Sequence, residues 1–507
     1  MLRDAKSLSS IEDMMHPKHW LSLLSCSVLV SILNIAGNTA TALAGSLVNS
    51  LTIPGESIDL SSLNGGSGGA NINRLGFFSD LYYDRHSNVY YGLGDRGPGG
   101  GVLNYNTRVQ KFSLDVNQNT GVISNFKLLD TILFTNNGNN YNGLNPRLLN
   151  GDSSVLGLSF DPEGFAISPT GNFYVSDEYG PSVYEFSSNG SFIRAFTTPN
   201  TILPQANGTP NFVDGRPILT SGRQDNRGFE GLTLSPDGTK LFAMLQDPLV
   251  NEGSPDGRRS NNLRIVEFDT ATGLSTAQYI YQLESLVDIN NRIPGTENDF
   301  GSNSQGRNIG ISAITAINNN EFLVLERDNR GVGEADPLGI APVASKQVYK
   351  ISLTGATDVS SISLVGTNTL PANVTPVSKS LFLDIASALK NAGETLPEKL
   401  EGLAIGPQLS DGSYALLLGT DNDFSVTQTG ENNTQFDVCT DGTSSTQVPI
   451  DSGCPEGQSL IPAYLYSFKV SSTELGEFIP PKKVPEPATI GGLALFGLSG
   501  LLFKRRK

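Results

Sequence analysis

The amino-acid sequence predicts an all-β fold, a β-propeller of about six blades with loop insertions and one short helix. Residues 161–196 read as four short strands joined by three tight turns, because aromatic and β-branched residues there are separated by Gly, Pro and Asn. The pattern of the first two strands recurs along the chain, as in repeat folds. The composition agrees, since 55 glycines and 28 prolines accompany only 17% charged residues.

Five copies of the strand pair are legible, and they begin near Phe78, Pro162, Phe229, Ile311 and Leu400. Their equivalent positions are spaced 84, 67, 82 and 89 residues apart, and these positions are Ser79, Glu163, Glu230, Ser312 and Glu401. The spacing is longer than a minimal blade, so loops must be inserted on the propeller frame. A sixth blade would be hidden in a degenerate stretch, or built from residues 46–60 and the C-terminal strands.

The one helix that the sequence predicts spans 379–392, where Leu381, Phe382, Ile385 and Leu389 share a face. We interpret it as an insertion. All-β rings often run long as one domain, so the 507 residues do not require several domains. The expected organisation is a signal peptide over 1–44, a propeller over 45–480 and a sorting signal over 484–507.

The N-terminal segment has the pattern of a signal peptide. An apolar run over 20–36 precedes Ala42-Leu43-Ala44, the small-residue pattern of a cleavage site. Acidic residues ahead of the run are unusual for a signal, and a start at Met14 or Met15 would leave a more basic beginning. A retained membrane anchor is the alternative.

The C-terminal segment has three parts: Pro485-Glu486-Pro487, an apolar run over 490–503 and a basic end over 504–507. The run is short for a bilayer span of ~20 residues, and the basic end is expected on the cytoplasmic side. The arrangement resembles the PEP-CTERM sorting signal of Gram-negative bacteria, including cyanobacteria. The resemblance implies cleavage by an exosortase-type enzyme and delivery to the cell surface, outer envelope or extracellular matrix; a plain tail anchor is the alternative.

Without the two end segments, the chain holds 27 Lys and Arg against 46 Asp and Glu. This balance argues against nucleic acid and anionic membrane surfaces as partners. It suits a protein that binds divalent cations, although acidity also keeps exported proteins soluble. Membrane contact is expected only through the C-terminal tail before processing.

The cysteines indicate one disulfide. Cys26 lies in the signal segment, and Cys439 and Cys454 lie in a polar stretch after the last repeat. Two cysteines in an exported chain favour a single bridge. A CxxC spacing is absent, so zinc is not expected.

Acidic residues recur where the channel mouth of the propeller should lie. The first two strands of each repeat are antiparallel, so the start of the first and the end of the second reach the same rim. The rim residues are, repeat by repeat, Ser79 with Asp95 and Arg96; Glu163 with Asp177 and Glu178; Glu230 with Gln246 and Asp247; Ser312 with Glu326 and Arg327; and Glu401 with Asp421, Asn422 and Asp423.

Carboxylates at one mouth would repel one another unless a cation neutralised them. Hard oxygen ligands in an irregular ring suit Ca²⁺. We therefore predict a Ca²⁺ site with the ligands Glu163, Glu230, Glu326, Glu401 and Asp423. The alternative is that each carboxylate only satisfies backbone N–H groups where blades meet.

The same rim offers acid–base and anion-binding groups. Asp177 or Glu178 would accept a proton from water, and Arg227 or Arg96 would fix the charge of a substrate. Arg96, Arg227 and Arg327 are equally able to form salt bridges with the neighbouring carboxylates.

Histidine-assisted nucleophilic catalysis is close to excluded. His16 and His19 lie in the signal segment, so His86 is the one histidine of the mature chain. It falls in a turn at the opposite end of its hairpin from the acidic rim. Residues 65–69 match G-x-S-x-G but lack the preceding strand and following helix, which favours a flexible loop.

Over about residues 70–470 the chain resembles the "esterase-like activity of phytase" family, in the segments DPEGFAISPTGNFYVSDEYGPSVYEF, NRGFEGLTLSPDGTKLFAMLQDP, RIVEFDTATG, FLVLERD and EGLAIGP…DNDF. The resemblance implies hydrolysis of phosphoesters or carboxylesters. A relation to β-propeller phytases would imply Ca²⁺ that bridges a substrate phosphate and the attacking water. The DAADDPAIW-like and NNVDIR-like runs of alkaline phytases are absent from this sequence, so phytate itself is not implied.

Two function classes follow. The first is an exported, Ca²⁺-assisted hydrolase that acts on a small ester or phosphoester at the acidic rim. The second is a non-catalytic propeller that binds glycans or proteins of the cell surface or matrix.

Overall fold

The computed structural model describes residues 45–63, 73–293, 309–343, 345–429 and 434–483. The predicted signal segment, Cys26, the loop over 65–69 and the C-terminal sorting segment lie outside the described residues. Within the described ranges, no helix is both long enough and apolar enough to cross a membrane.

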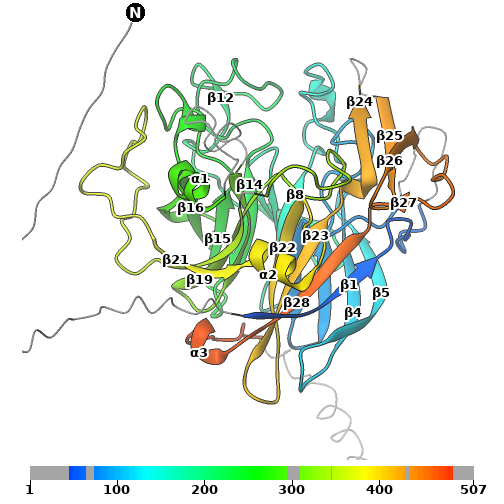
Figure 1. Ribbon diagram of the computed structural model, residues 1–507. Coiled ribbons are helices and arrows are strands. Elements are labelled where there is room, and N and C mark those ends of the chain that lie inside the picture. The colour runs from blue at the N-terminus through cyan, green and yellow to red at the C-terminus, as the bar shows by residue number, and fades with distance from the viewer. Residues whose placement is uncertain (1–44, 64–72, 294–308, 344, 430–433, 484–507) are drawn as a thin grey trace, which may run out of the picture. The chain divides into compact units, whose positions relative to one another are not determined.

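Five antiparallel sheets of four strands each share one order from the inner to the outer strand (Figure 1). The inner strands are β2 (Asp80–Asp84), β8 (Pro162–Ile167), β14 (Phe229–Leu234), β18 (Ile309–Ala316) and β22 (Lys399–Gln408). The second strands are β3 (Val89–Leu93), β9 (Phe173–Asp177), β15 (Lys240–Leu245), β19 (Glu321–Asp328) and β23 (Tyr414–Asp421). The third strands are β4 (Arg108–Val116), β10 (Val183–Phe186), β16 (Asn262–Asp269), β20 (Lys346–Ser352) and β28 (Ala463–Val470). The outer strands are β5 (Ile123–Leu133), β11 (Phe192–Ala195), β17 (Ser275–Gln282), β21 (Ser378–Asp384) and β1 (Ser46–Ile53).

The five inner strands contact one another in a cycle: β2 with β8, β8 with β14, β14 with β18, β18 with β22, and β22 with β2. This is the arrangement of a β-propeller, so the predicted fold class is confirmed. We number the sheets as blades 1 to 5 in the order of their inner strands. One buried apolar cluster fills each junction between consecutive blades, which explains why single blades cannot be stable alone.

The expected count of about six blades is corrected to five. The sequence offered residues 46–60 as part of a sixth blade. The strand β1 in this stretch instead pairs with β28 and completes blade 5. The two ends of the propeller chain therefore meet in one sheet, and this pairing joins the ring without an additional blade.

A further four-stranded sheet lies between β23 and β28 in the sequence and gives no inner strand to the cycle of contacts. It consists of β24 (Val426–Thr429), β25 (Thr434–Thr440), β26 (Ser445–Pro449) and β27 (Ser459–Leu460). The predicted disulfide is present in this region, between Cys439 and Cys454, with a Cα–Cα distance of 5.6 Å.

The predicted helix over 379–392 is only half correct. Residues 378–384 form the outer strand β21 of blade 4, and helix α2 spans Ile385–Ala392. The Asp384 side chain caps the helix by accepting a hydrogen bond of 3.0 Å from the Ser387 N–H, and Gly393 ends it with φ 71°. The pairing of β21 with β20 overrides the helical periodicity of the first half.

The remaining elements are short. Two hairpins are β6 (Thr135–Asn136) with β7 (Asn139–Asn140), and β12 (Gln205–Ala206) with β13 (Thr209–Pro210). The helices are α1 (Leu286–Arg292) and α3 (Ser472–Leu475), with 3₁₀ turns over Ser153–Val155, Gly257–Arg259 and Asp423–Ser425.

Candidate functional site

The inner strands carry a β-bulge near their starts, and the bulge positions agree with the predicted repeat. The pairing register shifts between Pro162 and Gly164, Phe229 and Gly231, Ile311 and Ala313, and Leu400 and Gly402. The residues within these shifts are Glu163, Glu230, Ser312 and Glu401. In blade 1, the Ser79 N–H donates to the Leu93 carbonyl at 3.1 Å, while Asp80 pairs with the same Leu93. A bulge turns its side chain out of the strand's normal alternation. These five residues form the first ring.

A glycine follows the bulge glutamate in blades 2, 3 and 5 because neighbouring inner strands approach closely there. A Cβ on Gly164 would lie 2.6 Å from the Leu232 Cβ of blade 3, and a Cβ on Gly402 would lie 2.8 Å from the Leu81 Cβ of blade 1. In the recurring Glu-Gly pair, the glutamate thus reaches the rim and the glycine allows the inner strands to pack closely.

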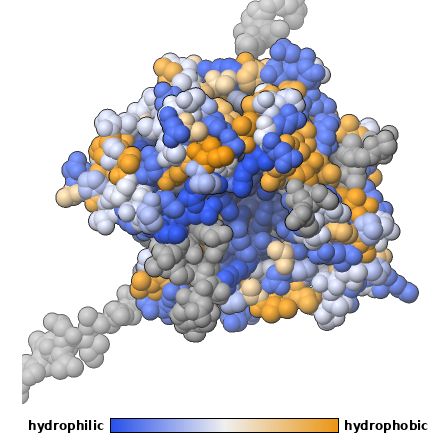
Figure 2. Space-filling view, turned by 90° about the horizontal axis from the view of Figure 1, so that it is seen from above, coloured by the Kyte–Doolittle hydropathy of each residue, from blue (hydrophilic) through white to orange (hydrophobic). Residues whose placement is uncertain are grey.

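A second residue from each blade reaches the same place from the end of the second strand. These residues form the second ring: Asp95, Glu178, Gln246, Arg327 and Asp421. All five are at least nine-tenths buried. We call the two rings together the acidic mouth. Viewed from the side where β12 and β24 lie in Figure 1, this face has a hydrophilic recess near its centre (Figure 2).

Carboxylates of the acidic mouth, together with those of Asp161 and Asp423 beside it, gather in three overlapping groups, and within each group the ligand oxygens lie within 4.8 Å of one another. Glu163 is shared by two of the groups and Asp95 by two, so the groups form one continuous arc. The groups are Glu163 with Glu178 and Glu230; Asp95 with Asp161 and Glu163; and Asp95 with Asp421 and Asp423.

Three cations neutralise parts of this arc. Arg96 Nη1 lies 2.8 Å from an Asp161 oxygen and 3.4 Å from a Glu178 oxygen. Lys399 Nζ lies 2.6 Å from Asp423 Oδ1.

Arg327 is the third of these cations. Its Nε donates to Ser312 Oγ at 2.9 Å, its Nη2 forms an ion pair with Glu401, and the same nitrogen lies 4.0 Å from Glu230 Oε1. Glu401, predicted as a metal ligand, therefore already has an arginine partner.

We call Glu163, Glu178 and Glu230 the Glu163 group. Two of its members, Glu163 and Glu230, are incompletely paired. Within the described ranges, Glu163 forms no ion pair and the buried Glu230 Oε2 has no hydrogen-bond partner. Burial raises the pKa of Glu163 well above its usual range, and the nearby Glu230 carboxylate adds to the rise. Burial likewise raises the pKa of Glu230, with Glu178 and Glu401 adding to it. A proton or a bound cation must therefore relieve the repulsion.

Two carboxyls beside this group titrate near neutrality. Burial raises the pKa of Asp161 to about 7 although Arg96 opposes the rise. Burial also raises the pKa of Asp95 to about 7, again against the influence of Arg96. The sequence placed Asp95 among the rim residues without assigning it a role, and it did not single out Asp161; Asp161 lies two positions before Glu163, a proximity that could have identified it.

The structure brings most of the predicted residues together but separates Glu326. Glu326 is fully buried on the other face of β19, where it accepts hydrogen bonds from Tyr281 Oη at 2.6 Å and from Lys379 Nζ at 2.6 Å. Its neighbour Arg327 faces the mouth instead, because successive strand residues point to opposite faces. Glu326 is therefore not placed with the other predicted ligands.

Asp177 also has a different environment from Glu178. Asp177 Oδ1 accepts from the N–H groups of Asp161 at 3.0 Å and Tyr179 at 3.1 Å, and Oδ2 accepts from the Gly180 N–H at 2.8 Å. This carboxylate shapes the turn after β9, and burial raises its pKa to about 7. Glu178, by contrast, belongs to the Glu163 group.

Arg227 lies beside the second ring in blade 3, where its Nη1 donates to Gln246 and its Nε lies 3.6 Å from Asp247 Oδ2. Its side chain is 29% exposed, more than that of Arg96 or Arg327. It is therefore the arginine of this rim that is most open to solvent.

These features lie within a region shared with known proteins. The family described as "Phytase-like: Esterase-like activity of phytase" matches residues 73–424. The chain belongs to this family. The matched region contains all five inner strands and every residue of the three carboxylate groups.

One curated relative is an "Uncharacterized secreted protein" of Arthroderma benhamiae, 28% identical over an alignment of 424 residues that covers 68% of this chain and 80% of the relative. A regucalcin of Agrobacterium tumefaciens, titled a calcium-binding protein, covers 87% of this chain and 98% of its own, at 12% identity and a TM-score of 0.30. A virginiamycin B lyase of Staphylococcus aureus covers 77% and 79%, at 9% identity and a TM-score of 0.27. Scores this low carry no argument, and the fold described above rests on the pairing of the strands.

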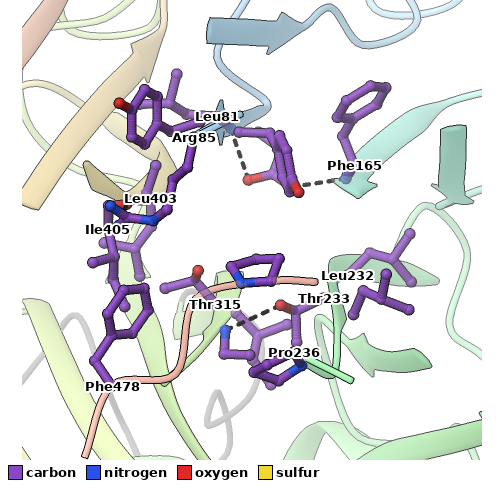
Figure 3. Close-up of a pocket in the computed structure, with 18 residues that line it drawn as sticks. Leu81, Arg85, Phe165, Leu232, Thr233, Pro236, Thr315, Leu403, Ile405 and Phe478 are labelled. Atoms are coloured by element: carbon purple, nitrogen blue, oxygen red, sulfur yellow. Dashed lines mark hydrogen bonds between the residues drawn. The ribbon is translucent and has the colours of Figure 1, made fainter. Parts of the chain in front are cut away.

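The opposite end of the channel has a different character. A pocket of about 50 Å³ there is lined mainly by apolar residues from all five inner strands, with Arg85 on one wall and Phe478, from the stretch after α3 (Ser472–Leu475), on another (Figure 3). Residues 477–483 are held by hydrogen bonds from the Ile479 N–H to Ile317 O and from the Lys482 N–H to Pro236 O, both of 2.8 Å. His86 Nε2 lies 3.2 Å from the Pro481 carbonyl, so the histidine lies away from the acidic mouth, as predicted.

Proposed function

We propose that the protein is an exported hydrolase of phosphoesters or carboxylesters that uses a divalent cation, Ca²⁺ by preference, at the acidic mouth. The observation that carries the proposal is the Glu163 group of three buried carboxylates. Among the described residues, Glu163 has no cationic partner and Glu230 Oε2 has no hydrogen bond. Family membership supports the hydrolytic class.

The donor set of the Glu163 group fits a hard cation. All three members offer carboxylate oxygens, the ligands that Ca²⁺ prefers, and their mutual distances allow one ion to contact all of them. Glu163, Glu178 and Glu230 would hold the ion, with Asp161 adjacent. A cation bound there would polarise a substrate oxygen and lower the pKa of a bound water.

The chain's own residues would supply the remaining functions. Glu178 accepts the proton of the attacking water, and Arg96, 3.4 Å from Glu178, holds that carboxylate in place. Arg227, the most exposed arginine of the rim, binds the negative charge of the substrate. An imidazole base has no part in this scheme, because His86 contacts the Pro481 carbonyl at the other end of the channel.

Export is part of the proposal. The curated relative is described as secreted, and the disulfide between Cys439 and Cys454 suits an oxidising compartment. The terminal segments of the sequence are proposed to act as a signal peptide and as a substrate of an exosortase-type enzyme. Fractionation of cells that carry a C-terminal deletion from residue 484 tests this, since the truncated protein should no longer be retained at the surface.

Glu163→Gln tests the hydrolase. With p-nitrophenyl phosphate and p-nitrophenyl acetate as probes, the variant should lose Ca²⁺ binding and lower turnover by about 100-fold or more. Glu185→Gln is the matched control, because Glu185 is a buried glutamate of the same blade that pairs with Arg194 away from the mouth. Its turnover should stay near that of the wild type.

The second candidate, a non-catalytic binding propeller, is favoured by one observation. Arg96, Arg327 and Lys399 already pair with much of the arc, as in a purely structural ring. Absence of calorimetric Ca²⁺ binding by the wild type, together with no turnover of either probe, would select this candidate.

A further inference from the structure

The end of the carboxylate arc away from the Glu163 group contains a lysine side chain, Lys399. Asp95, Asp421 and Asp423 place ligand oxygens within 4.8 Å of one another, as the Glu163 group does. Asp421 is 6% exposed, and its Oδ2 has no hydrogen-bond partner in the described part of the chain. By donor type and spacing, this group alone would suit a second hard cation.

The ammonium of Lys399 lies at this group, beside Asp421 and Asp423. Lys399 pairs with Asp421 across the β22–β23 ladder, which directs its side chain to the acidic group. Its Nζ lies 2.6 Å from Asp423 Oδ1 and 3.7 Å from Asp421 Oδ2. An ammonium is a compact point charge with three donors, and it therefore resembles a small cation more closely than a guanidinium does.

The repeat shows that this cation is specific to one blade. Lys399 stands two positions before the bulge residue Glu401, and Asp161 stands at the same offset before Glu163. The corresponding residues in blades 3 and 4 are Gly228 and Gly310. One blade thus adds a carboxylate to the arc and another adds an ammonium.

Asp95 joins the two ends of the arc, because it belongs both to the group of Asp161 and Glu163 and to the group of Asp421 and Asp423. We infer that Lys399 is a built-in second cation of the acidic mouth, which limits the site to one divalent ion at the Glu163 group. The Lys399 ammonium would then supply a second positive charge on the same arc for a substrate oxyanion. This inference rests on the proposed function for the divalent ion itself.

The experiment counts bound ions by calorimetry. Full-length protein freed of metal with a chelator is titrated with CaCl₂ near pH 8, as the wild type, Lys399→Met and Lys399→Arg. We expect one ion per chain for the wild type and for Lys399→Arg, and two for Lys399→Met. Lys240→Met is the matched control, because Lys240 pairs with Glu267 of β16 and begins β15, whose opposite end reaches the mouth; it should bind one ion.

The outcomes separate the two ideas. One ion bound by both wild type and Lys399→Met would overturn the inference and leave the proposed function standing. One ion bound by Lys399→Met and none by wild type would support the inference and remove the proposed metal site. No binding by either protein would overturn both.

A second variant covers the case in which Lys399→Met does not fold. If Asp423 serves Lys399 and not the divalent ion, Asp423→Asn should keep the wild-type Ca²⁺ affinity within about threefold, whereas Glu163→Gln should weaken it by at least about tenfold. An equal loss in both variants would make Asp423 a metal ligand and overturn the inference.

Discussion

Glu163 and Glu230 occupy the same bulge position in neighbouring blades, and their carboxylate oxygens lie within 4.8 Å of each other in a buried setting. Two such carboxylates cannot both be ionised without a compensating charge. This relationship governs the stability of the protein as well as its proposed chemistry.

The first prediction concerns pH and metal. The folded-state pKa values of Asp95 and Asp161 are raised by burial to about 7, above an unfolded value of about 3.9. The folded state then binds more protons than the unfolded state between about pH 4 and pH 7. In chelator, the free energy of unfolding should therefore fall as the pH rises through this window.

Thermal denaturation at pH 5, 6, 7 and 8 measures this effect. Addition of CaCl₂ at pH 8 should restore the melting temperature, and Glu230→Gln should flatten the decline by removing one of the repelling carboxylates. A melting temperature that rises from pH 5 to pH 7 in chelator would contradict the account.

Arg327 provides the second prediction. Arg327→Met removes the partner of buried Glu401 and should lower the free energy of unfolding by about 3–5 kcal/mol. The double variant Arg327→Met with Glu401→Gln should recover part of that loss, since position 401 then carries no unpaired charge. Urea denaturation of the two single variants, the double variant and the wild type gives the coupling; additive losses would show that the pair is not coupled.

The third prediction tests the close approach of the blades. Gly164→Ala should destabilise the protein by about 1–3 kcal/mol, because the new methyl group would meet the Leu232 Cβ and the Leu232 backbone nitrogen. Thr209→Ala, in an exposed hairpin, is the comparison and should change stability by less than about 0.5 kcal/mol. Equal stability of both variants would indicate that blades 2 and 3 can separate without cost.

The fourth prediction concerns the disulfide. Replacement of Cys439 and Cys454 by alanine removes a bridge across a sequence separation of 15 residues and should cost about 3 kcal/mol. Because the sheet of β24 to β27 contributes no inner strand, Ca²⁺ binding should persist in the folded variant. Thiol titration of the native protein should find Cys439 and Cys454 oxidised, and a loss of Ca²⁺ affinity in the variant would show that this sheet supports the mouth.

The repeat in the sequence was sufficient to predict much of this architecture. The five equivalent positions Ser79, Glu163, Glu230, Ser312 and Glu401 could be identified because each stands near the start of a strand of the same pattern. The disulfide followed from the count of cysteines. The blade count required the structure, because nothing local shows whether β1 begins a new sheet or pairs with β28, more than 400 residues later.

What only the tertiary structure decided is which residue of each rim dipeptide faces the channel. In Asp177-Glu178 and Glu326-Arg327, adjacent residues point to opposite faces, and a one-residue bulge in the partner strand changes which of them faces inward. The sequence therefore offered Glu326 and Asp177 as readily as Arg327 and Glu178. It also left the role of Lys399 hidden, because a lysine becomes a site residue only when folding places carboxylates beside its ammonium, here those of Asp421 and Asp423.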